Sequence, residues 1–123
     1  MNRFVLWLSL LLVVAHSFSS HAHTGMTLSV PADGAGVTGS PATLELVFSG
    51  DVRLVRLRIT SATKENVALE QSQALTPARR FVLPLPSLQP GVYTVNWVVM
   101  GSDSHKMNGN FTFTVREEGE PGV

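Results

Sequence analysis

The sequence of 123 residues contains no cysteine. In an oxidising compartment the protein therefore has no disulfide bond to stabilise it, and no thiolate is available as a metal ligand or as a catalytic nucleophile. Stability has to come from the packing of apolar side chains. Any strong metal ligands have to be nitrogen or oxygen atoms.

The sequence also lacks an excess of charge, because nine basic residues balance nine acidic ones. A protein that binds nucleic acid through its phosphates usually carries a clear excess of lysine and arginine. We therefore expect no nucleic acid among the partners of this chain.

No apolar run is long enough to cross a bilayer as a helix, which takes about 20 residues. The longest, from Phe4 to Ala15, follows Arg3 and precedes a polar stretch that ends in small residues. This order is typical of a secretory signal peptide. We predict that residues 1–22 are removed by a cut between Ala22 and His23, leaving a single exported domain over 23–123 that does not span the membrane. A cut after Ala15 obeys the same small-residue rule, but it would leave almost no polar segment before the scissile bond.

No segment of the mature chain shows a convincing helical period, whereas apolar and polar residues alternate in several places. The alternation is typical of strands with one buried face. Four segments show it most clearly, and three more are weaker candidates. The expected strands cover 44–48, 53–60, 92–99 and 110–115, with 26–30, 66–70 and 80–85 as the weaker ones. Seven short strands separated by turn residues predict an all-β fold, a sandwich of two packed sheets.

Two histidines remain after removal of the signal peptide, and both occupy unusual positions. His23 becomes the new N-terminus. His105 lies two residues after Asp103, in the loop between the expected strands 92–99 and 110–115. An N-terminal histidine offers its α-amine and its imidazole Nδ1 to one ion, and Asp103 and His105 would complete a set of three nitrogens and one oxygen. Such a set suits copper(II), with zinc as the second choice. The alternative is an unremarkable terminus and an ordinary loop histidine beside a turn aspartate.

Three stretches of the sequence resemble the CopC family of periplasmic copper-resistance proteins. The first is HTGMTLSVPADGAGV from His23, and the second is LELVFSGDV from Leu44. The third, GVYTVNWVVMGSDSHKMNGNFTFTV from Gly91, has the family's Tyr-x-Val-x-Trp, its Asp-x-His and its closing Phe-x-Phe-x-Val. The sequence departs from the family pattern at Val98, Ser104 and Lys106.

The resemblance implies a seven-stranded Greek-key β-sandwich, of the immunoglobulin-like or cupredoxin-like kind. It further implies that His23, Asp103 and His105 bind copper(II) in the periplasm. The protein would then sequester copper or pass it to an inner-membrane copper transport protein, without catalysis. Some relatives hold copper(I) in a methionine-rich loop, which is absent from this sequence. Its mature methionines, Met26, Met100 and Met107, are more simply core residues.

Two other functions stay open at the level of sequence. Copper-dependent polysaccharide oxygenases also bind their metal with an N-terminal histidine, although they need an open ligand position and an aromatic platform for sugar. A structural β-sandwich without metal is the third reading. Trp97 and Tyr93 lie on the buried face of their predicted strand, so we expect core aromatics, with Trp97 as an alternative shield for the metal site.

Overall fold

The computed structural model describes residues 25–69 and 76–119, and these contain six strands and no helix. The strands are β1 (Met26–Val30), β2 (Ala35–Thr38), β3 (Thr43–Ser61), β4 (Ala78–Pro84), β5 (Gly91–Gly101) and β6 (Lys106–Arg116). The expected signal peptide and His23 lie outside the described residues. In the part of the chain that is described, no helix is long and apolar enough to cross a membrane.

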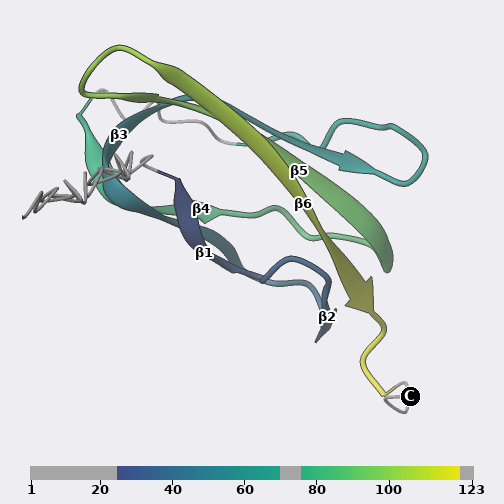
Figure 1. Ribbon diagram of the computed structural model, residues 1–123. Coiled ribbons are helices and arrows are strands. Elements are labelled where there is room, and N and C mark those ends of the chain that lie inside the picture. The colour runs from purple at the N-terminus through teal and green to yellow at the C-terminus, as the bar shows by residue number, and fades with distance from the viewer. Residues whose placement is uncertain (1–24, 70–75, 120–123) are drawn as a thin grey trace, which may run out of the picture.

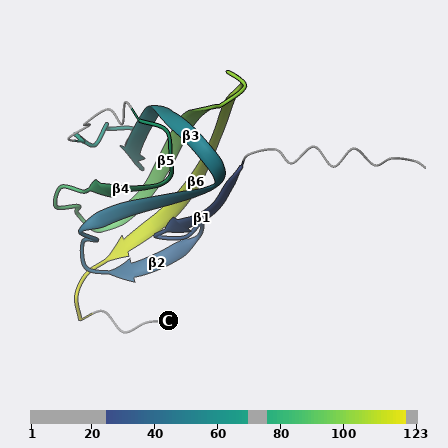
Figure 2. The same cartoon turned by 90° about the vertical axis from the view of Figure 1, so that its left-hand side faces the viewer.

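The strands form two layers because β3 is long enough to belong to both (Figures 1 and 2). Its first part, residues 43–48, pairs with β1 on one side and with β4 on the other. Its second part, residues 52–61, pairs with β5, which continues through β6 to β2. The bend between the parts falls at residues 49–51, where the register shifts. The result is an all-β, sandwich-like fold, as the sequence predicts.

The strand count differs from the expected seven in three ways. The segments 44–48 and 53–60 are one continuous strand, β3. Residues 66–69 make a single bridge, between Asn66 and Thr60, and no strand. Strand β2 was not expected, and it pairs in parallel with β6. Six strands therefore replace the seven of the prediction within the described residues.

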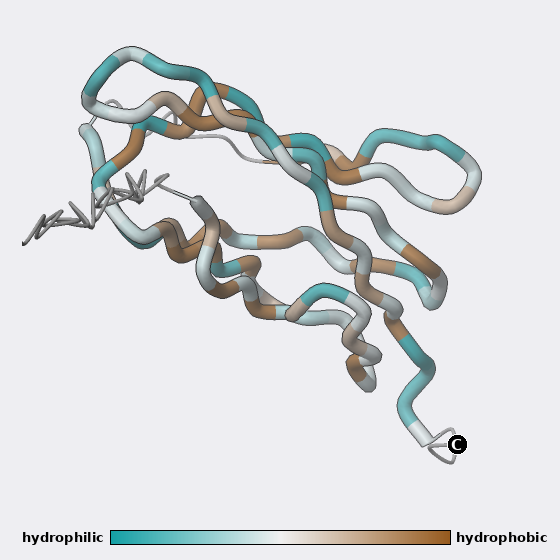
Figure 3. Tube along the Cα trace, in the orientation of Figure 1, coloured by the Kyte–Doolittle hydropathy of each residue, from teal (hydrophilic) through white to brown (hydrophobic). Residues whose placement is uncertain are grey.

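The core lies between the two layers and contains the inward-facing residues of the alternating segments (Figure 3). The side chains of Leu44, Leu46 and Ile59 are completely buried. Three ring contacts join the layers or neighbouring strands: Phe48 meets Phe81 and Trp97 edge to face, and Tyr93 stacks on Phe113. Such aromatic pairs add about 0.5–1.5 kcal/mol beyond the area that they bury.

One predicted core position is wrong. The alternation in 53–60 predicts that Val55 lies on the same buried face as Leu57 and Ile59, but its side chain is 44% exposed. The register of β3 against β5 shifts between Leu54 and Arg56, so Val55 is the extra residue of a bulge. Leu54 packs against the core in its place.

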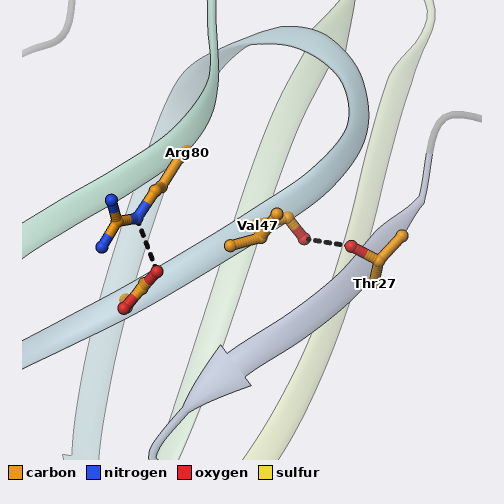
Figure 4. A network of polar contacts seen from close by, with 4 residues as sticks. Thr27, Val47 and Arg80 are labelled. Carbon is orange, nitrogen blue, oxygen red and sulfur yellow. Dashed lines mark hydrogen bonds and ion pairs between the residues drawn. The ribbon is translucent and has the colours of Figure 1, made fainter.

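The outer face of the three-stranded layer carries polar contacts between neighbouring strands (Figure 4). The guanidinium Nε of Arg80 on β4 donates to Glu45 Oε1 on β3 at 2.5 Å. On the other side of β3, the Thr27 hydroxyl donates to the carbonyl of Val47 at 3.3 Å. These contacts help to fix β1 and β4 against the strand that links the two layers.

Candidate metal site

The loop between β5 and β6 presents Asp103 and His105 at one end of the sandwich. The amide of Gly101 donates to the carbonyl of His105 at 3.0 Å, and the amide of Ser104 donates to the carbonyl of Gly101 at 3.0 Å. Ser104 adopts a positive φ of 65°, which is the left-handed conformation that closes tight turns. A Cβ on Gly101 would lie 3.0 Å from Asp103 Oδ1, so glycine leaves the room that the carboxylate occupies.

The carboxylate of Asp103 contacts His105 twice. Its Oδ1 accepts from the backbone amide of His105 at 3.1 Å, and its Oδ2 lies 2.7 Å from the imidazole Nδ1. The side-chain hydrogen bond, followed by the backbone one, lowers the pKa of the Asp103 carboxyl below its ordinary value. Both side chains remain in solvent, with 67% of Asp103 and 82% of His105 exposed. The pair is therefore accessible to an ion from outside.

The start of the described chain is fixed close to this loop through β3. The amide of Gly25 donates to Ser49 Oγ at 3.1 Å, and the amide of Ser49 donates to the carbonyl of Gly25 at 2.9 Å. Three residues further along β3, Val52 pairs with Gly101 at the base of the loop. Figures 1 and 2 both show the beginning of β1 and the β5–β6 loop at the same end of the molecule.

Of the three predicted ligands, the structure thus brings Asp103 and His105 together, and His23 lies outside the described residues. Within 25–69 and 76–119, no group of three histidine or acidic side chains could hold a metal ion. Ser49, which anchors the chain at Gly25, was not among the predicted site residues. No sequence signal identifies it, because its role depends on the register between β1 and β3.

Trp97 lies beneath this end of the sandwich as a core residue, which confirms the simpler of its two interpretations. It is 7% exposed, and its ring packs on Gly109, where a Cβ would lie 2.4 Å from the indole Cζ2. Its Nε1 is buried and has no hydrogen-bond partner among the described residues. The indole is held by packing rather than by a polar contact.

The three methionines do not face one another as a single cluster. Met26 and Met107 are partly buried against the core. Met100 pairs with Lys106 and Arg53, at positions that alternation places on the outer face of the sheet. The structure therefore favours the packing interpretation for Met26 and Met107.

The fold and the loop define a small all-β sandwich with an accessible carboxylate–imidazole pair at one end. Residues 26–116 match the CopC domain. The chain therefore belongs to the CopC family.

Two relatives are similar to this chain over most of their length. Protein YobA of Escherichia coli K12 is 36% identical over 108 residues, which cover 85% of this chain and 86% of that protein. Copper resistance protein C of Escherichia coli is 30% identical over 115 residues, which cover 85% of this chain and 90% of that protein.

Two crystal structures have the same fold. CopC from Methylosinus trichosporium OB3b superposes with a TM-score of 0.68 at 29% identity, over 81% of this chain and all of that one. PcoC, a methionine-rich copper resistance protein from Escherichia coli, superposes with a TM-score of 0.62 at 30% identity, over 77% of this chain and all of that one.

Proposed function

We propose that this protein is exported to the periplasm, where it binds one copper(II) ion and either sequesters it or passes it on. The ligands are the α-amine and imidazole of His23, the carboxylate of Asp103 and the imidazole of His105. The observation that supports this proposal most directly is the contact between Asp103 Oδ2 and His105 Nδ1 at 2.7 Å.

The donor set fits copper(II) in its chemistry. Adjacent ligands at right angles around bonds of about 2.0 Å are about 2.8 Å apart, so the Asp103 and His105 atoms need little movement to share an ion. The lowered pKa of Asp103 keeps its carboxylate ionised and ready to bind. Nitrogen-rich sets of this kind favour copper(II) over the other divalent ions of the first row.

The chain is short enough between its anchor and its predicted terminus to deliver the remaining ligands. His23 comes two residues before Gly25, which is bonded to Ser49. Two extended residues span about 7 Å at most, so the proposed site requires only that the β5–β6 loop lie within this reach of the Gly25 anchor. Export and cleavage before His23 are part of the proposal, because only cleavage creates the free α-amine.

We infer a binding protein rather than an enzyme. An oxygenase acting on polysaccharides needs a flat aromatic surface for sugar rings, and the large hydrophobic side chains exposed among the described residues are all aliphatic. The family resemblance points to an inner-membrane copper transport protein as the recipient of the ion.

A calorimetric titration of the processed protein with copper(II) tests the site. We expect a one-to-one complex. Acetylation of the α-amine of His23 should weaken it at least about a hundredfold, because the amine becomes an amide and its chelate ring with the imidazole is lost. His105→Ala should weaken it by a similar factor, because one imidazole ligand is lost.

The matched control is Asn110→Ala, which changes an exposed polar residue on β6, away from the loop. This variant should bind copper as the unmodified protein does. Equal affinity with and without the acetyl group would exclude the terminal amine. Absence of a one-to-one complex would leave the metal-free structural role. A sustained release of peroxide from the copper-loaded protein with a reductant would instead indicate an enzyme.

A further inference from the structure

The outer face of the layer made by the second part of β3 with β5, β6 and β2 carries most of the protein's described cations. Alternation along each strand, together with the burial of the intervening residues, places these side chains outside. Five of the eight lysines and arginines in the described residues are at such positions, and all five are exposed. We call this set the basic face: Arg53, Arg56, Arg58, Lys106 and Arg116.

Four of the five cations gather at the end of the face that adjoins the β5–β6 loop. Arg53, Met100 and Lys106 form one row across β3, β5 and β6, directly beside Gly101. The next row places Arg56 beside Val98. Arg58 lies one row further, beside Asn96. With about 6.8 Å between such rows and about 4.8 Å between strands, four positive charges share a patch of roughly 14 by 10 Å.

No outward position of residues 52–61, β5 or β6 carries a carboxylate, although Asp51, just before this part of β3, lines the same pocket as Arg53 and Met100. The outward positions of β5 and β6 carry asparagine, threonine, valine and methionine besides the cations. The two ion pairs found within 25–69 and 76–119 are Arg80 with Glu45 and His105 with Asp103, so no cation of the basic face has a carboxylate partner there. On the opposite layer, by contrast, Arg80 is paired with Glu45, where the contact serves only to hold two strands together.

Protection of a sheet edge explains part of this arrangement. Residues 53–56 of β3 have no strand beside them on their outer side among the described residues, and charged side chains on edge strands discourage pairing with other proteins. That reason extends to Lys106, because β2 pairs with β6 only at residues 113–116, but it does not apply to Arg116, which lies between β5 and β2 and pairs with Thr38. Nor does it explain why the charged residues at the outward positions of residues 52–61, β5 and β6 all have one sign in a chain with no net charge.

Side-chain chemistry distinguishes between the two kinds of anionic partner. A membrane surface is usually met by lysines and arginines together with tryptophan or tyrosine at the level of the head groups. The basic face has four arginines and one lysine, and the large exposed hydrophobics of the described residues include no aromatic. Arginine and methionine are enriched in protein–protein interfaces, where the planar guanidinium binds carboxylates with two hydrogen bonds.

We propose that the basic face is a docking surface for an acidic protein, one that presents aspartate and glutamate side chains to Arg53, Arg56, Arg58 and Lys106. Electrostatic attraction of this kind speeds the encounter and fixes the orientation of the two proteins. In the complex the β5–β6 loop lies at the rim of the contact. The use of this orientation for copper transfer rests on the proposed function, whereas the docking itself does not require the metal.

The test uses the processed protein without metal, labelled with ¹⁵N, and two capped ten-residue peptides as probes. One alternates glutamate with threonine, and the other alternates glutamine with threonine. At low salt the glutamate peptide should shift the amide signals of residues 53–58, 98–100 and 106–108. Shifts should shrink at 0.2 M salt, where charges are screened over about 8 Å, and the glutamine peptide should cause none.

Two double variants with equal loss of charge separate the face from the rest of the surface. Arg56→Gln with Arg58→Gln should weaken binding of the glutamate peptide about five- to tenfold, the effect of two exposed ion pairs. Lys64→Gln with Arg79→Gln removes two exposed cations elsewhere and should change it less than about twofold.

Three results would overturn the proposal. The first is a set of shifts spread over the surface, and the second is an equal effect of the two double variants. The third is strong binding to vesicles of phosphatidylglycerol, absent with phosphatidylcholine and lost in the Arg56 and Arg58 variant, with no binding of the peptide. That outcome would assign the face to lipid. Because no copper is present, failure here leaves the metal titration unaffected, and failure of that titration leaves this result unaffected.

Discussion

Ser49 and Gly25 are joined by two hydrogen bonds, one from each backbone amide. This reciprocal contact ties the beginning of β1 to the bend of β3, where the strand passes from one layer to the other. Val52, on the far side of the same bend, pairs with Gly101 at the base of the β5–β6 loop. A short stretch of one strand therefore holds both the loop and the segment that follows His23.

Substitution Ser49→Ala removes the hydroxyl that accepts from the Gly25 amide, while the backbone bond in the other direction remains. We expect copper(II) affinity to fall about two- to tenfold, since one hydrogen bond is worth about 0.5–1.5 kcal/mol. The free energy of unfolding should fall by no more than the same amount, about 1.5 kcal/mol at most. Ser61→Ala is the matched control, because its hydroxyl accepts from the Glu65 amide at the far end of β3. Equal affinities of the two variants would show that this anchor does not serve the site.

Substitution Gly109→Ala should destabilise the fold by about 1–3 kcal/mol, because the new methyl group would meet the Trp97 ring across the β5–β6 pair. Urea unfolding of the metal-free protein measures this. Asn108→Ala, at the preceding exposed position of β6, should stay within about 0.5 kcal/mol of the unmodified protein. Similar stabilities of the two variants would mean that the indole moves aside without cost.

Tryptophan fluorescence should report which metal is bound. The sequence has two tryptophans, and Trp7 is lost with the predicted signal peptide. Trp97 then remains as the single source, under the same end of the sandwich as the loop. Copper(II) should quench its emission, with an end point at one equivalent, whereas zinc, with its filled d shell, should not. Emission that is unchanged by one equivalent of copper(II) would argue against binding at this end.

The pH dependence of copper binding should come from the nitrogen ligands and not from Asp103. The hydrogen bonds from His105 lower the pKa of the Asp103 carboxyl in the folded protein. The contribution of these hydrogen bonds to the stability of the folded protein is therefore complete above the ordinary pKa of about 3.9. It is lost only as the pH falls through the lower pKa of the folded state. Between pH 5 and 8, Asp103→Asn should lower the affinity by a constant factor, about tenfold or more, with an unchanged slope. Titrations across this range measure both. A slope that becomes shallower in the variant would show that Asp103 takes up a proton there.

Much of the fold could be predicted, because buried side chains leave a two-residue period in the sequence. The alternation in 92–99 identified Tyr93, Val95, Trp97 and Val99 as core residues, and all four are buried. The continuity of β3 could not be predicted, since Ser49, Gly50 and Asp51 are typical of a turn. Strand β2 is short and glycine-rich, and it forms by parallel pairing with a strand far along the chain. Sequence periodicity carries no information on such long-range pairing.

The candidate site was predictable to the extent that its groups are neighbours in sequence. The spacing of Asp103 and His105 already brings a carboxylate close to an imidazole in a tight loop, and the structure places them in contact. The position of the chain start depends instead on the pairing of β1 with β3, which is set by packing of the whole core. His23 as a ligand stays a prediction.

The passage of β3 through both layers has a consequence for the lifetime of the protein. Ser49 and Val52 keep their separation only while both layers are folded, so a copper ion bound at the proposed site would stabilise the native state alone. Metal-free chains would open more often and meet proteases more often. The amount of this protein in the cell would then follow the copper supply through turnover, without any change in its synthesis.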